Sequence, residues 1–143
     1  MSKFLVPALA LSLVLGGCGE SPVEPVAVSG TEACVEITPI DDELDRYECD
    51  EEMSDQRVSG VSVVGVTEVD ATVTPMYIAG TIVITNEGGV WEGTWTGSIA
   101  ADGRHVVEGE LIGTADYEGL AYRARWEYYD WPATVTGTIE LAP

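Results

Sequence analysis

The feature that most constrains the fold is a strict alternation of apolar and polar side chains in the C-terminal part of the chain. From Trp91 to Ile99 the odd positions carry tryptophan, glycine or isoleucine, whereas the even positions carry glutamate, threonine or serine. A side-chain period of two is that of a β-strand with one buried face and one face in water. The same period recurs on both sides of this segment, which predicts an antiparallel sheet with one apolar face.

Turn residues divide this part of the chain at short intervals. Clusters of proline, glycine, asparagine and aspartate separate runs rich in valine, isoleucine, threonine and aromatic residues, which are typical of strands. We expect strands near residues 57–69, 76–85, 90–100, 104–115, 119–130 and 133–141. A further strand near 32–38 would bring the number to about seven. Successive strands joined by short turns form an antiparallel meander.

Glycines recur on the apolar side of these strands. The glycines that share this parity are Gly80, Gly93, Gly97, Gly109, Gly113 and Gly137. Inward glycines let a strand bend and leave space for large rings. The predicted fold is therefore all-β, a small antiparallel up-and-down β-barrel, with a β-sandwich as the alternative. The opposite parity carries Glu92, Glu108, Glu110, Arg123, Arg125, Glu127 and Glu140, and such an outer face is too charged for a membrane pore.

The N-terminus has the layout of an export signal. Lys3 precedes an uncharged, largely apolar run from Phe4 to Leu15, which is shorter than the roughly 20 residues of a membrane-spanning helix. The sequence Leu15-Gly16-Gly17-Cys18 resembles the lipobox of bacterial lipoproteins. This resemblance implies cleavage before Cys18, lipid on its thiol, and anchoring to the cell envelope: the outer membrane in a Gram-negative cell, otherwise the cell surface. An ordinary signal peptide with an incidental cysteine is the alternative.

Composition sets the domain count and excludes one class of partner. Beyond the predicted signal peptide, five arginines stand against 25 acidic residues, a net charge of −20. Nucleic acid is excluded as a direct partner because phosphate binding needs a basic face. We expect a signal peptide over 1–17, a flexible tether over 18–31, an acidic disulfide-closed segment over 32–56 and one barrel domain over 57–143. The oligomeric state is left open.

Two cysteines remain once Cys18 is assigned to lipid. An even pair in an oxidising compartment predicts a Cys34–Cys49 disulfide, whereas a metal site is the rival interpretation and lacks a nearby histidine. The acids that follow, from Asp41 to Asp55, would suit calcium, but the EF-hand order is missing and acidic runs are usually solvated. The segment is expected to be a short helix or a loop, with no metal and no cofactor.

A family resemblance covers roughly residues 58–141. The segments that carry it are Gly80-Thr-Ile-Val-Ile-Thr, Trp91-Glu-Gly-Thr-Trp-Thr-Gly, Glu108-Gly-Glu-Leu-Ile-Gly-Thr-Ala-Asp-Tyr-Glu-Gly-Leu and Gly137-Thr-Ile. They resemble the glycine-centred strands of the allene oxide cyclase and dirigent barrel group. The resemblance implies an eight-stranded barrel with an apolar cavity, in a group that includes cyclases. No active-site motif of those enzymes is matched, so no catalytic residue is assigned.

Five aromatic residues are predicted to share the inward face: Trp91, Trp95, Tyr122, Trp126 and Tyr128. They either fill the core or line a cavity for an apolar guest. The few inward charges expected favour an apolar or aromatic molecule. A non-enzymatic binding role is therefore predicted, with a filled barrel acting through its surface, or a cyclase-like enzyme, as alternatives. A cavity below roughly 300 Å³ would argue against binding.

The only histidine of the sequence is His105, at a strand start near a barrel mouth. A histidine at a turn is usually a surface residue, and a role as general base requires a positioned substrate. Motifs of hydrolases, metalloproteases and nucleotide-binding proteins are missing. His105 is therefore not assigned a catalytic role.

Overall fold

The computed structural model describes residues 24–143, so the predicted signal peptide and Cys18 lie outside the described residues. The described chain forms eight strands: β1 (Val26–Ile37), β2 (Asp45–Met53), β3 (Gly60–Asp70), β4 (Met76–Asn86), β5 (Gly89–Ile99), β6 (His105–Gly113), β7 (Leu120–Tyr128) and β8 (Ala133–Leu141). Two short 3-10 helices, η1 (Gln56–Val58) and η2 (Ala115–Tyr117), lie in connections.

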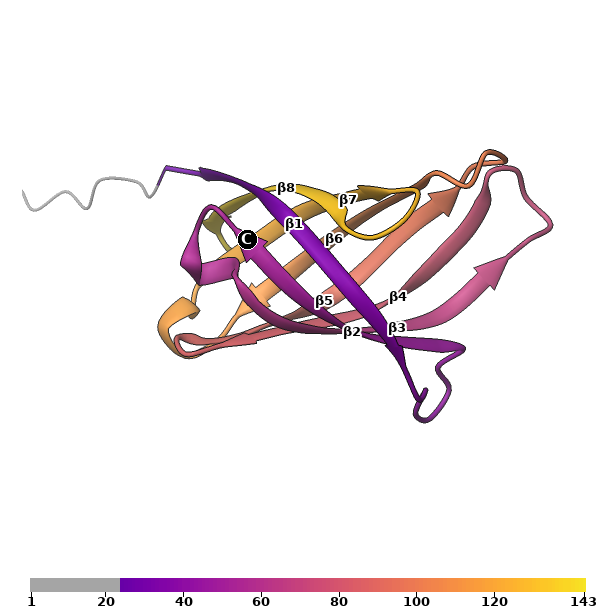
Figure 1. Ribbon diagram of the computed structural model, residues 1–143. Helices are drawn as coiled ribbons and strands as arrows, with labels where there is room; N and C mark the ends of the chain where they lie inside the picture. Colours follow the sequence, from indigo (N-terminus) through magenta and orange to yellow (C-terminus); the bar gives the residue numbers. More distant parts are fainter. Residues whose placement is uncertain (1–23) are drawn as a thin grey trace, which may run out of the picture.

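Each strand pairs antiparallel with the next, and β8 pairs with β1, so the sheet closes into a barrel (Figure 1). The predicted all-β up-and-down barrel is confirmed and the sandwich alternative is wrong. The six strands predicted from residue 57 onward correspond to β3 to β8, with bounds that agree within three residues. All the pairing needed for closure lies within residues 24–143, so this part of the chain is a complete folding unit.

The structure corrects the predicted domain boundaries at the N-terminal side. Residues from Val26 onward belong to β1, and the acidic segment supplies β2, so neither the tether to residue 31 nor the segment 32–56 stands apart from the barrel. The strand count is eight, one more than expected. In β2 the acids at 48, 50 and 52 face water, while Cys49, Glu51 and Met53 are buried. Exposed and buried residues thus alternate along β2, but the buried face includes a glutamate, Glu51, among its apolar residues.

The disulfide is confirmed, but its surroundings differ from the prediction. Cys34 and Cys49 lie directly opposite each other on β1 and β2, with Cα atoms 4.0 Å apart. The disulfide therefore crosslinks the neighbouring strands β1 and β2 on the inner face of the sheet. The stretch between the cysteines is a strand hairpin, not the expected helix or isolated loop.

Inward glycines make room for rings, as predicted. A Cβ atom built on Gly80 would lie 2.6 Å from Cζ2 of Trp95, and one on Gly137 would lie 2.7 Å from Cε2 of Tyr122. Both distances are below normal contact. The Cβ atoms would also lie against the carbonyl oxygens of Gly65 and Arg123 on the neighbouring strands, so a larger residue at either position would disturb both the ring and the strand pairing.

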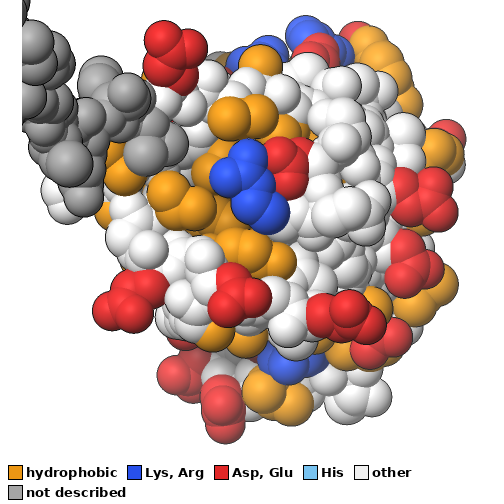
Figure 2. Space-filling model, turned by 90° about the vertical axis from the view of Figure 1, so that its left-hand side faces the viewer, with side chains coloured by type: hydrophobic (Ala, Val, Ile, Leu, Met, Phe, Trp, Pro, Cys, Tyr) orange, Lys and Arg blue, Asp and Glu red, His pale blue; other side chains and the backbone are white. Residues whose placement is uncertain are grey.

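One end of the barrel is closed by packed side chains. Val58 of η1 and Tyr117 of η2 are buried there, and Trp91 stacks on Tyr117 with ring centroids 4.9 Å apart. The Trp91 indole N–H donates to the carbonyl of Arg57 at 2.6 Å. The chain enters β1 and leaves β8 at this same end, on the left of Figure 1. Figure 2 looks onto it and shows hydrophobic side chains near the centre, around a basic and an acidic side chain, with further acidic groups toward the edge.

Asn86, at the end of β4, joins the connections at the closed end. Its amide nitrogen donates to the carbonyls of Arg57 at 2.9 Å and Ser59 at 2.8 Å. Its amide oxygen accepts from the Tyr117 hydroxyl at 2.6 Å and from the N–H of Gly88 at 3.0 Å. One side chain thus satisfies polar groups from three connections.

The outer face of β6, β7 and β8 carries paired charges, in agreement with the predicted polar parity. Arg125 pairs with Glu108 at 2.9 Å, and Arg123 bridges Glu110 at 3.1 Å and Glu140 at 3.0 Å. In residues 24–143 no helix is long and apolar enough to cross a membrane.

Candidate functional site

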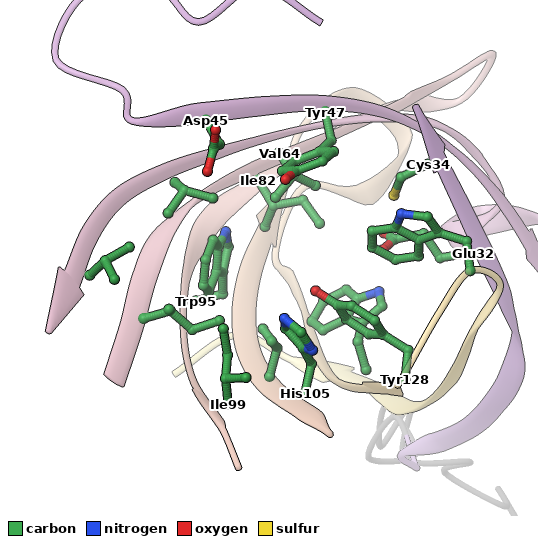
Figure 3. Close-up of a pocket in the computed structure, with 16 residues that line it drawn as sticks. Glu32, Cys34, Asp45, Tyr47, Val64, Ile82, Trp95, Ile99, His105 and Tyr128 are labelled. Carbon is green, nitrogen blue, oxygen red and sulfur yellow. The ribbon is translucent and has the colours of Figure 1, made fainter. Parts of the chain in front are cut away.

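A cavity of about 310 Å³ occupies the half of the barrel away from the chain's entry point (Figure 3). It opens between the loops of residues 38–44, 71–75, 100–104 and 129–132. Strand direction divides its lining into a floor, nearer the closed end, and a rim. The floor is formed by Glu32, Val64, Ile82, Trp95, Val107 and Trp126, and the rim includes Asp45, Tyr47, Val69, Ile99, His105, Tyr128 and Trp131.

The predicted aromatic cluster divides between the cavity and the core. Trp95, Trp126 and Tyr128 line the cavity. Trp91 and Tyr122 lie beneath it, 0% and 1% exposed, and meet edge to face with ring centroids 6.0 Å apart. Both sequence-based alternatives therefore apply, cavity lining for three of the rings and core packing for two.

A row of stacked rings forms one side of the rim. The His105 ring stacks on Tyr128 at 4.5 Å, and Tyr128 stacks on Trp131 at 4.3 Å. Tyr47 follows, with its ring centroid 6.3 Å from that of Trp131. His105 therefore lies at the mouth, as predicted, with Nδ1 2.9 Å from the carbonyl oxygen of Gly103. Burial raises the pKa of Tyr128 above the ordinary tyrosine value, and Glu32 and Tyr47 add to the increase.

Sequence reasoning missed Tyr47 and Trp131. Tyr47 was hidden in the acidic stretch assigned outside the barrel. Trp131 lies in the connection between β7 and β8, where the pair Trp131-Pro132 indicates a turn and nothing more. A tryptophan beside a proline in a turn was the available signal, since large apolar residues at loop tips often mark binding sites.

Two carboxyl groups lie inside the barrel, which corrects the expectation of few inward charges. Glu32 of β1 and Glu51 of β2 stand directly opposite each other and are 4% and 3% exposed. Glu32 lines the cavity floor, whereas Glu51 lies behind it, near the buried Ser62. From the sequence alone, these two inward glutamates were not distinguished from the exposed acids around them.

Burial is the main influence on the protonation of this pair. Desolvation raises the pKa of both carboxyls, and the nearby Glu32 raises that of Glu51 further. Glu51, Ser62 and Trp126 act in the opposite direction on Glu32, because each can donate a hydrogen bond to its ionised form. Ser62 and Trp126 lower the pKa of Glu51 in the same way, so the two carboxyls share these donors, and their burial side by side favours a proton held by the pair.

Several polar atoms around this pair have no hydrogen-bond partner of normal geometry. They are Oε2 of Glu32, Oε1 of Glu51, Oγ of Ser62, the hydroxyl of Tyr122 and Nε1 of Trp126. Buried polar groups in native proteins are nearly always paired with protein, water or ligand. Glu32 and Trp126 are the two of these residues that line the cavity.

Within residues 24–143, the one group of three side chains spaced to hold a metal ion is Glu32, Cys34 and Cys49. The two sulfurs are joined in the disulfide, and metal coordination by cysteine requires the thiolate. The exposed acids of the β1–β2 hairpin form no such group in this part of the chain, and Glu43 pairs with Arg46 at 2.8 Å.

Comparison of the chain with protein-family models, with curated proteins and with solved structures finds no match in any of the three.

Proposed function

We propose that this protein is an exported lipoprotein, anchored through Cys18, whose barrel binds an apolar small molecule without chemical conversion. The observation that carries the binding role is the cavity of about 310 Å³. It meets the size of roughly 300 Å³ at which ligand pockets begin. Its floor is mainly aliphatic and aromatic, which is the usual lining of a small-molecule site.

The mouth has features suited to the entry of an apolar guest. Exposed apolar side chains stand on or beside three of its loops: Leu44 is 55% exposed, Val73 44% and Tyr129 59%. Apolar groups exposed around an opening mark ligand or partner sites more often than ordinary surface. They would give a guest its first contacts before it reaches the rings of the rim.

The direction of β1 relates the cavity to the proposed anchor. Residue 24 enters the barrel at the closed end, and the mouth lies at the other end. Six residues beyond Cys18 would reach at most about 20 Å when extended. A lipid on Cys18 would therefore hold the closed end toward the membrane and leave the mouth facing the aqueous compartment, so the ligand would enter from water.

A neutral hydrophobic fluorescent probe, N-phenylnaphthylamine, tests the binding role. We expect saturable binding to the oxidised chain of residues 24–143 and a loss of about tenfold in affinity for Trp95→Ala, because that ring forms part of the floor. Trp91→Phe is the matched control, since Trp91 is buried outside the cavity. A response that does not saturate, or that is equal for both variants, would favour the alternative in which the barrel acts only through its acidic surface.

A further inference from the structure

We propose that the guest of this cavity is a hydrophobic amine, bound in its protonated form with the ammonium group against Glu32. This inference rests on the proposed binding function and specifies the chemical class of the ligand. The apolar part of the molecule would lie along the aliphatic and aromatic walls between floor and rim.

The first observation is the unpartnered oxygen of Glu32. The side chain is 4% exposed, it lines the floor, and its Oε2 accepts no hydrogen bond. An unpaired acceptor buried in an apolar interior is destabilising, by more when it is charged. An ammonium group supplies both the missing donor and the opposite charge.

Burial raises the pKa of Glu32, and the groups behind this carboxyl act against the increase. Glu51 can keep the proton of the pair, and Glu51, Ser62 and Trp126 lie near enough to lower the pKa of Glu32, while Oε2 of Glu32 itself has no hydrogen-bond partner. Glu51 and Ser62 do not line the cavity. Glu32 would therefore present the negative charge to a guest, while Glu51 remains neutral beneath it.

The second observation is the sign of the charge around the cavity. Glu32 and Asp45 are acidic lining residues, and the lining contains neither lysine nor arginine. Two arginines near the mouth pair with other acids, Arg46 with Glu43 and Arg104 with Glu127. Low-dielectric walls of one charge sign attract ions of the other sign. A cation is favoured here, and an anionic guest such as a fatty acid is disfavoured.

The third observation is the ring system at the rim. His105, Tyr128, Trp131 and Tyr47 form a continuous row of rings, and Trp95 and Trp126 extend the aromatic surface to the floor. The faces of tyrosine and tryptophan rings attract cations; Tyr128 is stacked between His105 and Trp131, so this attraction comes from the other rings of the lining. The path from mouth to floor therefore stabilises a positive head group as well as an apolar body.

The test compares three guests that differ only in the head group: octylamine, octanol and octanoate. Each is titrated by calorimetry into the oxidised chain of residues 24–143 at neutral pH and competed against N-phenylnaphthylamine. We expect octylamine to bind about ten- to a hundredfold more tightly than octanol, the range of a hydrogen bond to a charged group. Octanoate is expected to bind more weakly than octanol.

Variants separate the role of Glu32 from the general acidity of the protein. Glu32→Gln should lower octylamine affinity to that of octanol and leave octanol binding unchanged, which also shows that the cavity is intact. Glu92→Gln removes the same charge from an exposed outward position on β5 and should preserve the amine preference. Glu32→Asp keeps the charge and should keep part of the preference.

The outcomes distinguish the two proposals. Equal binding of octylamine and octanol, or an amine preference that survives Glu32→Gln, would overturn the amine assignment and leave the binding function in place. If neither the three guests nor the fluorescent probe bind, both proposals fail.

Discussion

The buried carboxyl pair makes barrel stability depend on pH in a direction unusual for acidic side chains. Burial and the neighbouring Glu32 raise the pKa of Glu51 far above its ordinary value of 4.5. Between the ordinary and the raised pKa, the folded chain holds a proton that the unfolded chain releases. The free energy of unfolding therefore falls as pH rises through this window, and the stabilisation is fully present only below the ordinary pKa.

Glu51→Gln isolates this effect. Glutamine has nearly the same shape as a protonated glutamate but does not ionise, so variant and parent should have similar stability near pH 5. Each proton held only by the folded chain lowers the free energy of unfolding by about 1.4 kcal/mol per pH unit. From about pH 6 to about pH 8 the parent should therefore lose about 3 kcal/mol relative to Glu51→Gln.

The measurement is urea denaturation of residues 24–143 at a series of pH values with the disulfide intact. Ordinary surface acids are already ionised throughout this window, and Glu92→Gln controls for the general effect of removing one negative charge. The reasoning is refuted if Glu51→Gln follows the same pH dependence as the parent, or if Glu92→Gln flattens it equally. The first result would mean that Glu51 ionises in the folded barrel as readily as in the unfolded chain, and the second would mean that the pH dependence reflects the general charge of the protein.

Three further predictions follow from the structure. Cys34→Ser or Cys49→Ser should destabilise the whole barrel by about 3 kcal/mol, seen as a lower denaturation midpoint, and an unchanged midpoint would show that the crosslink adds nothing. Asn86→Ala should cost about 2 to 3 kcal/mol because it leaves the groups of the closed end unpaired, whereas Tyr117→Phe, which removes one of its hydrogen bonds, should cost about 1 kcal/mol. Cys18→Ser should abolish palmitate labelling and release the protein from the membrane fraction, and label persisting in the variant would contradict the anchor.

The strands from β4 to β8 could be predicted because most of their inward positions carry apolar residues or glycine, with His105 at the start of β6 as a polar exception. In these strands the apolar residues coincide with one parity of the strand period, so the inward-facing residues can be assigned one by one from the sequence. Gly80 and Gly137 follow the same logic, since a space left by glycine is filled by a ring from a neighbouring strand.

The strand predicted near 32–38 corresponds to the second half of β1, whereas the first half of β1 and the whole of β2 were not predicted because inward positions of these strands break that rule. Glu32 and Glu51 occupy inward positions, where the alternating pattern requires apolar side chains. In β2, exposed acids precede and follow Glu51, so in the sequence Glu51 resembles one more member of a solvated acidic run. β3 adds another obstacle, a register shift between Val66 and Glu68. An extra residue in a strand reverses the facing of those that follow, which brings Val69 to the cavity.

The two ends of the barrel treat buried polar groups differently. At the closed end, the Trp91 indole N–H and the Asn86 amide have protein partners. Around the cavity floor, the Trp126 indole N–H, Oε2 of Glu32 and Oε1 of Glu51 have none of normal geometry. An apolar pair at positions 32 and 51 would avoid the desolvation of two carboxyls and often stabilises a protein. Two of the residues with unpaired groups, Glu32 and Trp126, line the cavity, and the proposed guest with a complementary head group would pair the acid at the cavity floor.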